Sequence, residues 1–274
     1  MKLTPLLIFL TLFVSHTISA QLSQSYSNPL ELNHQYGIYY FTANEHFIHF
    51  QTSLYQTAQP LANSNDYFSN TKPFSGLHQI AMQLEANRKV SPNFHLGIVP
   101  QINFRNDNTT YSLRPNITHN GNLYKLQFLK TFGLSLSKQV FEKNSNPYIS
   151  TVPITLATFD LGLALAYKIP FPKLPLRLML SYKVFFIKEF TDDDAKIYDK
   201  RYVDFDQLKL SIQTLLARKV NISLWGAFQN QYLLALANNI SQEKNIRFNT
   251  PMIGWEIKYF LGVPNQKNNY SFIF

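Results

Sequence analysis

Residues 94–105 read FHLGIVPQINFR, and the pattern of this stretch decides the fold class. Apolar side chains occupy every second position, at Phe94, Leu96, Ile98, Pro100, Ile102 and Phe104. Alternation with a period of two over this length is typical of a β-strand whose two faces meet different environments. The turn signal Ser91-Pro92-Asn93 precedes the stretch, and residues 80–87 alternate in the same way before it. Two antiparallel strands joined by a tight turn are therefore expected here.

The same alternation recurs along most of the chain. We expect strands at 46–57, 80–87, 94–105, 124–137, 176–186, 208–216, 222–236 and 253–261, and two more within 148–167 that separate near residues 158–160. Most of these stretches have the length of about 9 to 11 residues with which a tilted strand crosses a bilayer. The chain is also rich in aromatic residues, with 23 Phe and 16 Tyr beside 15% charged residues, as expected for a membrane wall with aromatic girdles.

The connections between these strands differ in length. Long polar segments are expected at 58–77, 106–122, 188–204 and 237–246, and short ones at 91–93, 142–147, 169–175 and 217–221. Long and short connections mostly alternate, except at 158–160, as they do in outer-membrane barrels with long outer loops and short periplasmic turns. The sequence therefore predicts an all-β fold, an antiparallel up-and-down transmembrane β-barrel of about 10 strands, within a range of about 8 to 12.

The N-terminus has the features of an export signal. Met1 and Lys2 are followed by the apolar stretch 3–14 and by Ile18-Ser19-Ala20, which predicts a cleavable signal peptide at 1–20. No cysteine is present, so neither a lipid anchor nor disulfides are expected. Residues 21–45 are expected to form an N-terminal segment that plugs, precedes or joins the wall, and residues 46–274 the barrel. The expected location is the bacterial outer membrane.

The chain resembles bacterial outer-membrane β-barrel proteins as a class, over about residues 46–274. Its ending, with Tyr270, Phe272 and Phe274, resembles the alternating aromatic ending that the barrel-assembly machinery reads. That machinery and outer-membrane lipid are therefore expected partners. Gln21 as the first mature residue, with a composition rich in Asn, Phe and Lys, resembles proteins of the Bacteroidetes. Residues 25–30, SYSNPL, are similar to the start of the PorP/SprF family of type IX secretion.

Motifs for catalysis, metal binding and nucleic-acid binding are not found in the sequence. No histidine is followed two residues later by serine, and no Asp-x-His pair occurs, so a barrel enzyme is not expected. Asp192-Asp193-Asp194 could hold a hard cation, but an exposed acidic loop is the more common meaning of such a run, and we expect no metal site. No cofactor motif is present. The basic residues are scattered despite a pI near 9.5, which argues against nucleic acid as a partner.

Three functions fit these observations: a small porin-like pore, a structural or accessory barrel in an envelope or secretion complex, and a soluble secreted β-sandwich that binds a ligand. About ten strands leave an interior that side chains nearly fill. The faces of the expected strands predict a lumen lined by the charged residues Arg105, Lys125, Arg177, Lys183, Lys209, Lys258, Glu85 and Glu256. Since the cations outnumber the carboxylates, any solute admitted should be an anion, and the central Lys183, Lys209 and Lys258 should decide this preference.

Overall fold

A computed structural model describes residues 24–27, 30–42, 46–57, 77–105, 108–141, 154–169, 176–190, 205–216, 219–236 and 243–261. The expected signal peptide, Asp192–Asp194 and the aromatic ending at 270–274 lie outside these residues. The described part consists of the strands β1 (Gln24–Ser27), β2 (Glu31–Phe41), β3 (Phe47–Thr57), β4 (Leu77–Ser91), β5 (Phe94–Arg105), β6 (Asn108–Leu123), β7 (Leu126–Phe141), β8 (Ile154–Ile169), β9 (Leu176–Phe190), β10 (Phe205–Leu216), β11 (Val220–Leu236) and β12 (Glu243–Leu261). No helix in these ranges is long and apolar enough to cross a membrane.

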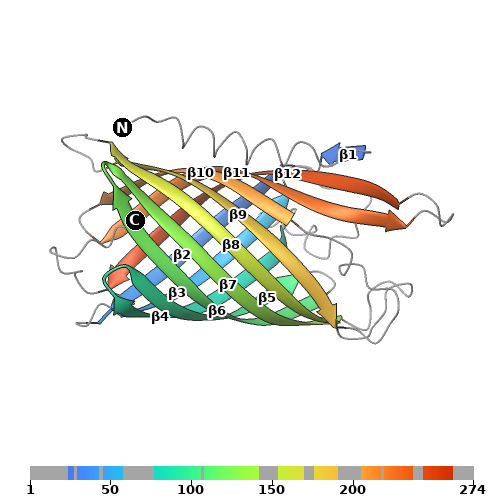
Figure 1. Cartoon of the computed structure of the whole chain (residues 1–274), viewed down its shortest axis with the longest axis horizontal. Coiled ribbons are helices and arrows are strands. Elements are labelled where there is room, and N and C mark those ends of the chain that lie inside the picture. The colour runs from blue at the N-terminus through green and yellow to red at the C-terminus, as the bar shows by residue number, and fades with distance from the viewer. Residues whose placement is uncertain are drawn as a thin grey trace.

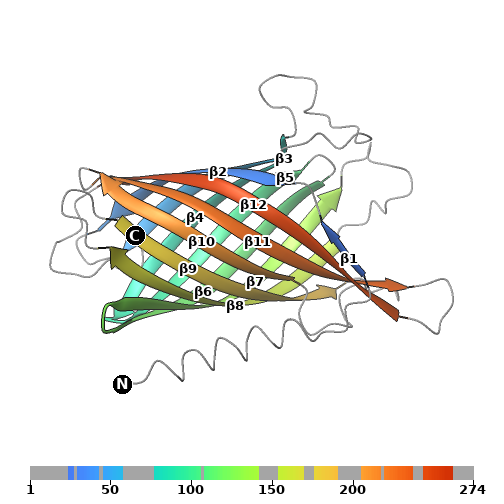
Figure 2. The same ribbon diagram turned by 90° about the horizontal axis from the view of Figure 1, so that it is seen from above.

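The strands form one closed barrel, as Figures 1 and 2 show from two sides. From β2 to β12, each strand pairs antiparallel with the next one in the chain. The barrel closes where β12 pairs with β2 in parallel, from Met252 opposite Glu31 to Leu261 opposite Tyr40. The short β1 pairs in parallel with an earlier part of β12. The predicted all-β barrel of about ten strands is therefore confirmed, with β2 to β12 as its wall.

The parallel closure departs from the expected all-antiparallel arrangement. In an up-and-down sheet, the first and last strands run in the same direction when the number of strands is odd. The wall from β2 to β12 has an odd number of strands, so these two strands can close the barrel only as a parallel pair. Bacterial outer-membrane barrels usually have an even number, whereas the mitochondrial anion channel has an odd one.

Three differences from the expected strands explain the count. Residues 31–41 of the expected N-terminal segment form β2 and join the wall. Residues 108–123, most of which were expected within a loop, form β6, whose Asn, Pro and Gly residues have low strand propensity. The expected break near 158–160 is wrong because β8 runs unbroken through Asp160, whose carboxylate bonds to an arginine inside the barrel.

The connections are sorted by the two ends of the barrel. At one end, here called the short-turn end, the strands are joined by residues 42–46, 92–93, 124–125, 170–175 and 217–219. At the opposite, long-loop end they are joined by residues 58–76, 106–107, 142–153, 191–204 and 237–242. The expected alternation thus holds with two exceptions at the long-loop end. The connection between β5 and β6 has two residues, and the connection between β11 and β12 has six, no more than residues 170–175 at the other end.

The two faces of the wall have opposite polarity. Large apolar side chains are exposed on the outer face, among them Leu134, Leu210 and Ile253. Polar and charged side chains are buried on the inner face, including Asn33, Asp160 and Glu256. This distribution is the reverse of that in a water-soluble protein, where apolar side chains fill the interior. It is the distribution of a barrel whose outer wall meets lipid.

Candidate functional site in the barrel lumen

Aromatic side chains narrow the lumen near the short-turn end. Tyr39 and Phe41 of β2, Phe47 of β3 and Phe260 of β12 form a buried cluster beside the parallel seam. The ring centroid of Tyr39 lies 5.7 Å from that of Phe47 and 5.4 Å from that of Phe260. Leu215 of β10 packs against the cluster. Because these side chains project inward from neighbouring strands, they fill one side of the lumen at this end.

Arg177 lies on the inner face near the same end, on a different part of the wall. It is only 7% exposed, and its Nε and Nη1 atoms have no hydrogen-bond partner among the described residues. A cavity of about 10 Å³, close to the size of one water molecule, lies beside it and is also lined by Gln127 of β7 and by the small Ala164 and Ala166 of β8. A buried cation without a hydrogen-bond partner is unfavourable, so a water molecule in this cavity would stabilise Arg177.

An ion pair crosses the middle of the inner wall between β6 and β8. The guanidinium of Arg114 donates to both carboxylate oxygens of Asp160, from Nε to Oδ1 at 2.8 Å and from Nη2 to Oδ2 at 2.5 Å. Asp160 is 1% exposed. Gly133 of β7 lies opposite Asp160 in the register between β7 and β8, and a side chain at this glycine would collide with both charged groups. The glycine therefore makes the pair possible.

A second charged region lies on β10, β11 and β12. Lys258 Nζ is 2.9 Å from Glu256 Oε2, two positions away on the same inner face of β12. Lys209 Nζ lies 4.2 Å from the ring centroid of Trp225, in a cation–π contact. The indole of Trp225 covers Gly254 of β12, where no larger residue would fit.

Glu85 belongs to a third group, close to the aromatic cluster. His49 Nδ1 lies 3.5 Å from Glu85 Oε2, and the His49 ring stacks on Tyr39 with 3.7 Å between their centroids. Asn87 donates a 2.6 Å hydrogen bond to the same carboxylate. The carboxylate of Glu85 is thus already held by protein groups.

Cations exceed carboxylates on this inner face. Asp160 and Glu256 are paired with Arg114 and Lys258, whereas no carboxylate in the described ranges lies within ion-pair distance of Lys183, Lys209 or Arg177. Lys183 also lies within electrostatic range of the charges of Arg114, Asp160 and Glu85. Among the inner-face residues that the structure describes, the cations are therefore not all balanced by carboxylates.

The structure separates the predicted lumen residues into three groups. Lys183, Lys209, Lys258, Glu85, Glu256 and Arg177 occupy inner-face positions on their strands. Arg105 shares the inner-face alternation of β5 but is exposed at the long-loop end, where its Nε donates a 3.0 Å hydrogen bond to Gln79. Lys125 does not line the lumen, because it is exposed in the turn between β6 and β7, next to Tyr124 with a positive φ of 56°.

Sequence reasoning missed Arg114 and Asp160. Arg114 lay in the expected loop 106–122, and Asp160 lay in the expected break. The signal that could have identified Asp160 is its alternation with Gly162, Ala164 and Ala166, which places it on the inner face of one continuous strand. The described residues contain no group of three or more His, Cys, Asp or Glu side chains that could hold a metal ion.

No protein-family model matches this chain. No curated protein matches it either, so the resemblance to the PorP/SprF family stays a prediction. A structure of the NanC porin is similar over 84% of this chain and 99% of the porin chain, with 8% sequence identity and a TM-score of 0.42. At this level of similarity, what the barrel does has to be inferred from its own residues.

Proposed function

We propose that this chain is an outer-membrane β-barrel that forms a narrow passive pore with a preference for small anions. The exposed apolar outer wall and the length of the strands support a membrane location. The observation that carries the pore proposal is the excess of inner-face cations, in particular Lys183, Lys209 and Arg177, over unpaired carboxylates.

The anion preference follows from the electrostatics of a narrow lumen. A low-dielectric wall focuses the field of the cations along the axis and raises the local concentration of anions. Lys258 contributes less than the sequence suggested, because Glu256 neutralises it at 2.9 Å. Lys183 and Lys209 therefore carry most of the expected selectivity.

Reversal potentials in planar bilayers under a salt gradient test this function. The unmodified barrel should be anion-selective, and the double variant Lys183→Glu/Lys209→Glu should shift the reversal potential toward cations. Lys130→Glu is the control for charge reversal outside the lumen, because Lys130 is exposed on the outer face of β7. Its change of charge equals that of either single lumen substitution. Cation selectivity of the unmodified barrel, or an equal shift in the control, would contradict the proposal.

The aromatic cluster favours a second candidate function, that of a structural or accessory barrel. Tyr39, Phe41, Phe47 and Phe260, together with the ion pairs, fill much of the interior near the seam. If they close the lumen, the unmodified barrel should show no conductance steps, and Phe47→Ala/Phe260→Ala should introduce them. Co-purification with a larger envelope complex would then support the accessory role. A soluble β-sandwich does not fit, because the strands form one closed sheet with a polar interior.

A further inference from the structure

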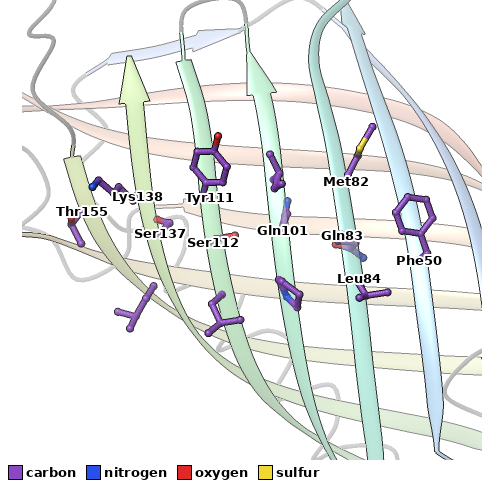
Figure 3. A pocket seen from close by; sticks show the side chains of 14 residues that line it. Phe50, Met82, Gln83, Leu84, Gln101, Tyr111, Ser112, Ser137, Lys138 and Thr155 are labelled. Atoms are coloured by element: carbon purple, nitrogen blue, oxygen red, sulfur yellow. The ribbon is translucent and has the colours of Figure 1, made fainter. Parts of the chain in front are cut away.

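A shallow groove lies on the outer face of the barrel and spans β3 to β8 (Figure 3). Its volume is about 770 Å³, within the range of about 300 to 1,000 Å³ of sites that hold small ligands. Most of the side chains that line it are apolar and exposed, among them Phe50, Met82, Leu84 and Leu113. Nothing in the pore proposal uses this surface.

Two rows of side chains line the groove, and they differ in polarity. The first row contains Phe50 opposite Leu84, and Pro100 opposite Leu113, which in turn lies opposite Leu136. The second row lies closer to the long-loop end and contains Met82, Ile102, Tyr111, Lys138 and Thr155, paired in that order. The first row is entirely apolar, whereas the second ends in three side chains with polar groups.

Lys138 provides the charge at the polar end of the groove. It is exposed on the outer face of β7, three positions before the strand ends at Phe141. No carboxylate in the part of the chain that the structure describes lies within ion-pair distance of it. A lipid-facing lysine is costly at the bilayer midplane and costs little near the interface, so its amine belongs at the level of the lipid headgroups. The hydroxyl groups of Tyr111 and Thr155 come from its neighbours in the register.

We propose that this groove binds a membrane lipid with a phosphate monoester headgroup, in the leaflet at the long-loop end. The phosphate bonds to Lys138 and to the Tyr111 and Thr155 hydroxyls, and an acyl chain lies along the apolar rows between Phe50 and Leu136. A cation and two hydroxyl donors match the oxygens of a phosphate monoester, which carries more negative charge than a zwitterionic headgroup. This inference rests on the proposed membrane location and is independent of ion conduction.

Native mass spectrometry of the detergent-purified full chain tests the groove, with dioleoyl phosphatidic acid and dioleoyl phosphatidylcholine as probes. The barrel should retain phosphatidic acid in preference to phosphatidylcholine. Lys138→Gln should lower retention of phosphatidic acid by about tenfold, the effect of losing one charge-assisted contact. Lys130→Gln on the same strand and the same face, but toward the short-turn end, should leave retention unchanged.

A second variant tests the apolar part without removing charge. Pro100→Phe places a ring in the middle of the groove and restores a backbone N–H, so the strand should fold, but the acyl chain should be displaced and retention should fall for both lipids. Equal retention of the two lipids by the unmodified barrel, or equal losses in Lys138→Gln and Lys130→Gln, would overturn the inference. Ion conduction without selective lipid retention would reject the groove alone, and retention without conduction would reject the pore alone.

Discussion

The lipid-facing assignment of β10 can be tested by moving one arginine along its outer face. Leu210 is 49% exposed in the middle of this strand, and Leu216 is 40% exposed at its last position. The two leucines share a strand, a face and a residue type. Leu210→Arg and Leu216→Arg therefore differ mainly in depth within the bilayer.

The expected magnitude follows from the geometry of the strand. Six residues at about 3.3 Å each separate the two positions by about 20 Å along the strand, or about 15 Å along the membrane normal at a tilt of about 40°. This is about half of the apolar thickness of about 25 to 30 Å. Leu210→Arg should therefore cost about 2 to 4 kcal/mol and Leu216→Arg about 0 to 1 kcal/mol in the free energy of unfolding.

Urea unfolding of the barrel in phospholipid vesicles measures both costs, and a gel without boiling verifies that each variant is folded beforehand. A difference of about 2 to 3 kcal/mol changes the unfolding equilibrium constant by about 30- to 150-fold, which this assay resolves. Leu210→Met is the control for the loss of leucine and should cost less than about 1.5 kcal/mol. Equal costs for the two arginine variants would refute the reasoning, because they would mean that depth, and hence lipid, is irrelevant at these positions.

Three further predictions concern the interior, the faces and the seam. Asp160→Asn removes the buried carboxylate that neutralises the half-buried Arg114 and should lower the free energy of unfolding by about 3 to 5 kcal/mol, measured in the same vesicles. A loss below about 1 kcal/mol would mean that solvent already screens the pair. Of the two tryptophans, Trp255 is on the outer face and Trp225 on the inner face. Brominated lipids should therefore strongly quench the fluorescence of Trp225→Phe, which keeps only Trp255, and weakly quench that of Trp255→Phe, which keeps only Trp225. The opposite order would mean that the faces of β11 and β12 are inverted. The parallel seam predicts that two cysteine pairs each form a disulfide in this cysteine-free chain, whereas antiparallel pairing would allow at most one of them. These pairs are Leu32→Cys/Ile253→Cys and Ile38→Cys/Tyr259→Cys.

The sequence by itself determined the fold class and most of the strand faces. Alternation is a local property, since successive side chains of a strand point to opposite faces, and in a barrel one face meets lipid and the other the lumen. For this reason residues 94–105 and 208–216 could be assigned correctly from their letters. The sorting of loops by length was also visible in the sequence. Successive connections of any up-and-down sheet lie alternately at its two ends, so their lengths can be compared without a structure.

Local pattern was insufficient where polar residues occupy both faces or a charge lies inside. In β6, Thr109, Pro115 and His119 interrupt the outer apolar face, so its alternation is weak and the sequence alone predicts a loop. In β8, Asp160 suggested a break, although it is buried because Arg114 reaches it from two strands away. No local signal reports a partner that is 46 positions distant in the chain.

Two features were decided only by the tertiary structure. The parallel closure depends on the parity of the number of strands, so one missed or divided strand changes it. The charges of the lumen depend on which side chains meet across neighbouring strands: Glu256 neutralises Lys258 and leaves Lys183, Lys209 and Arg177 without a carboxylate. The sequence alone determined that cations would line the barrel, because strand faces are local. Which cations remain unpaired was decided by the register between strands, because ion pairing requires distances that only the closed sheet defines.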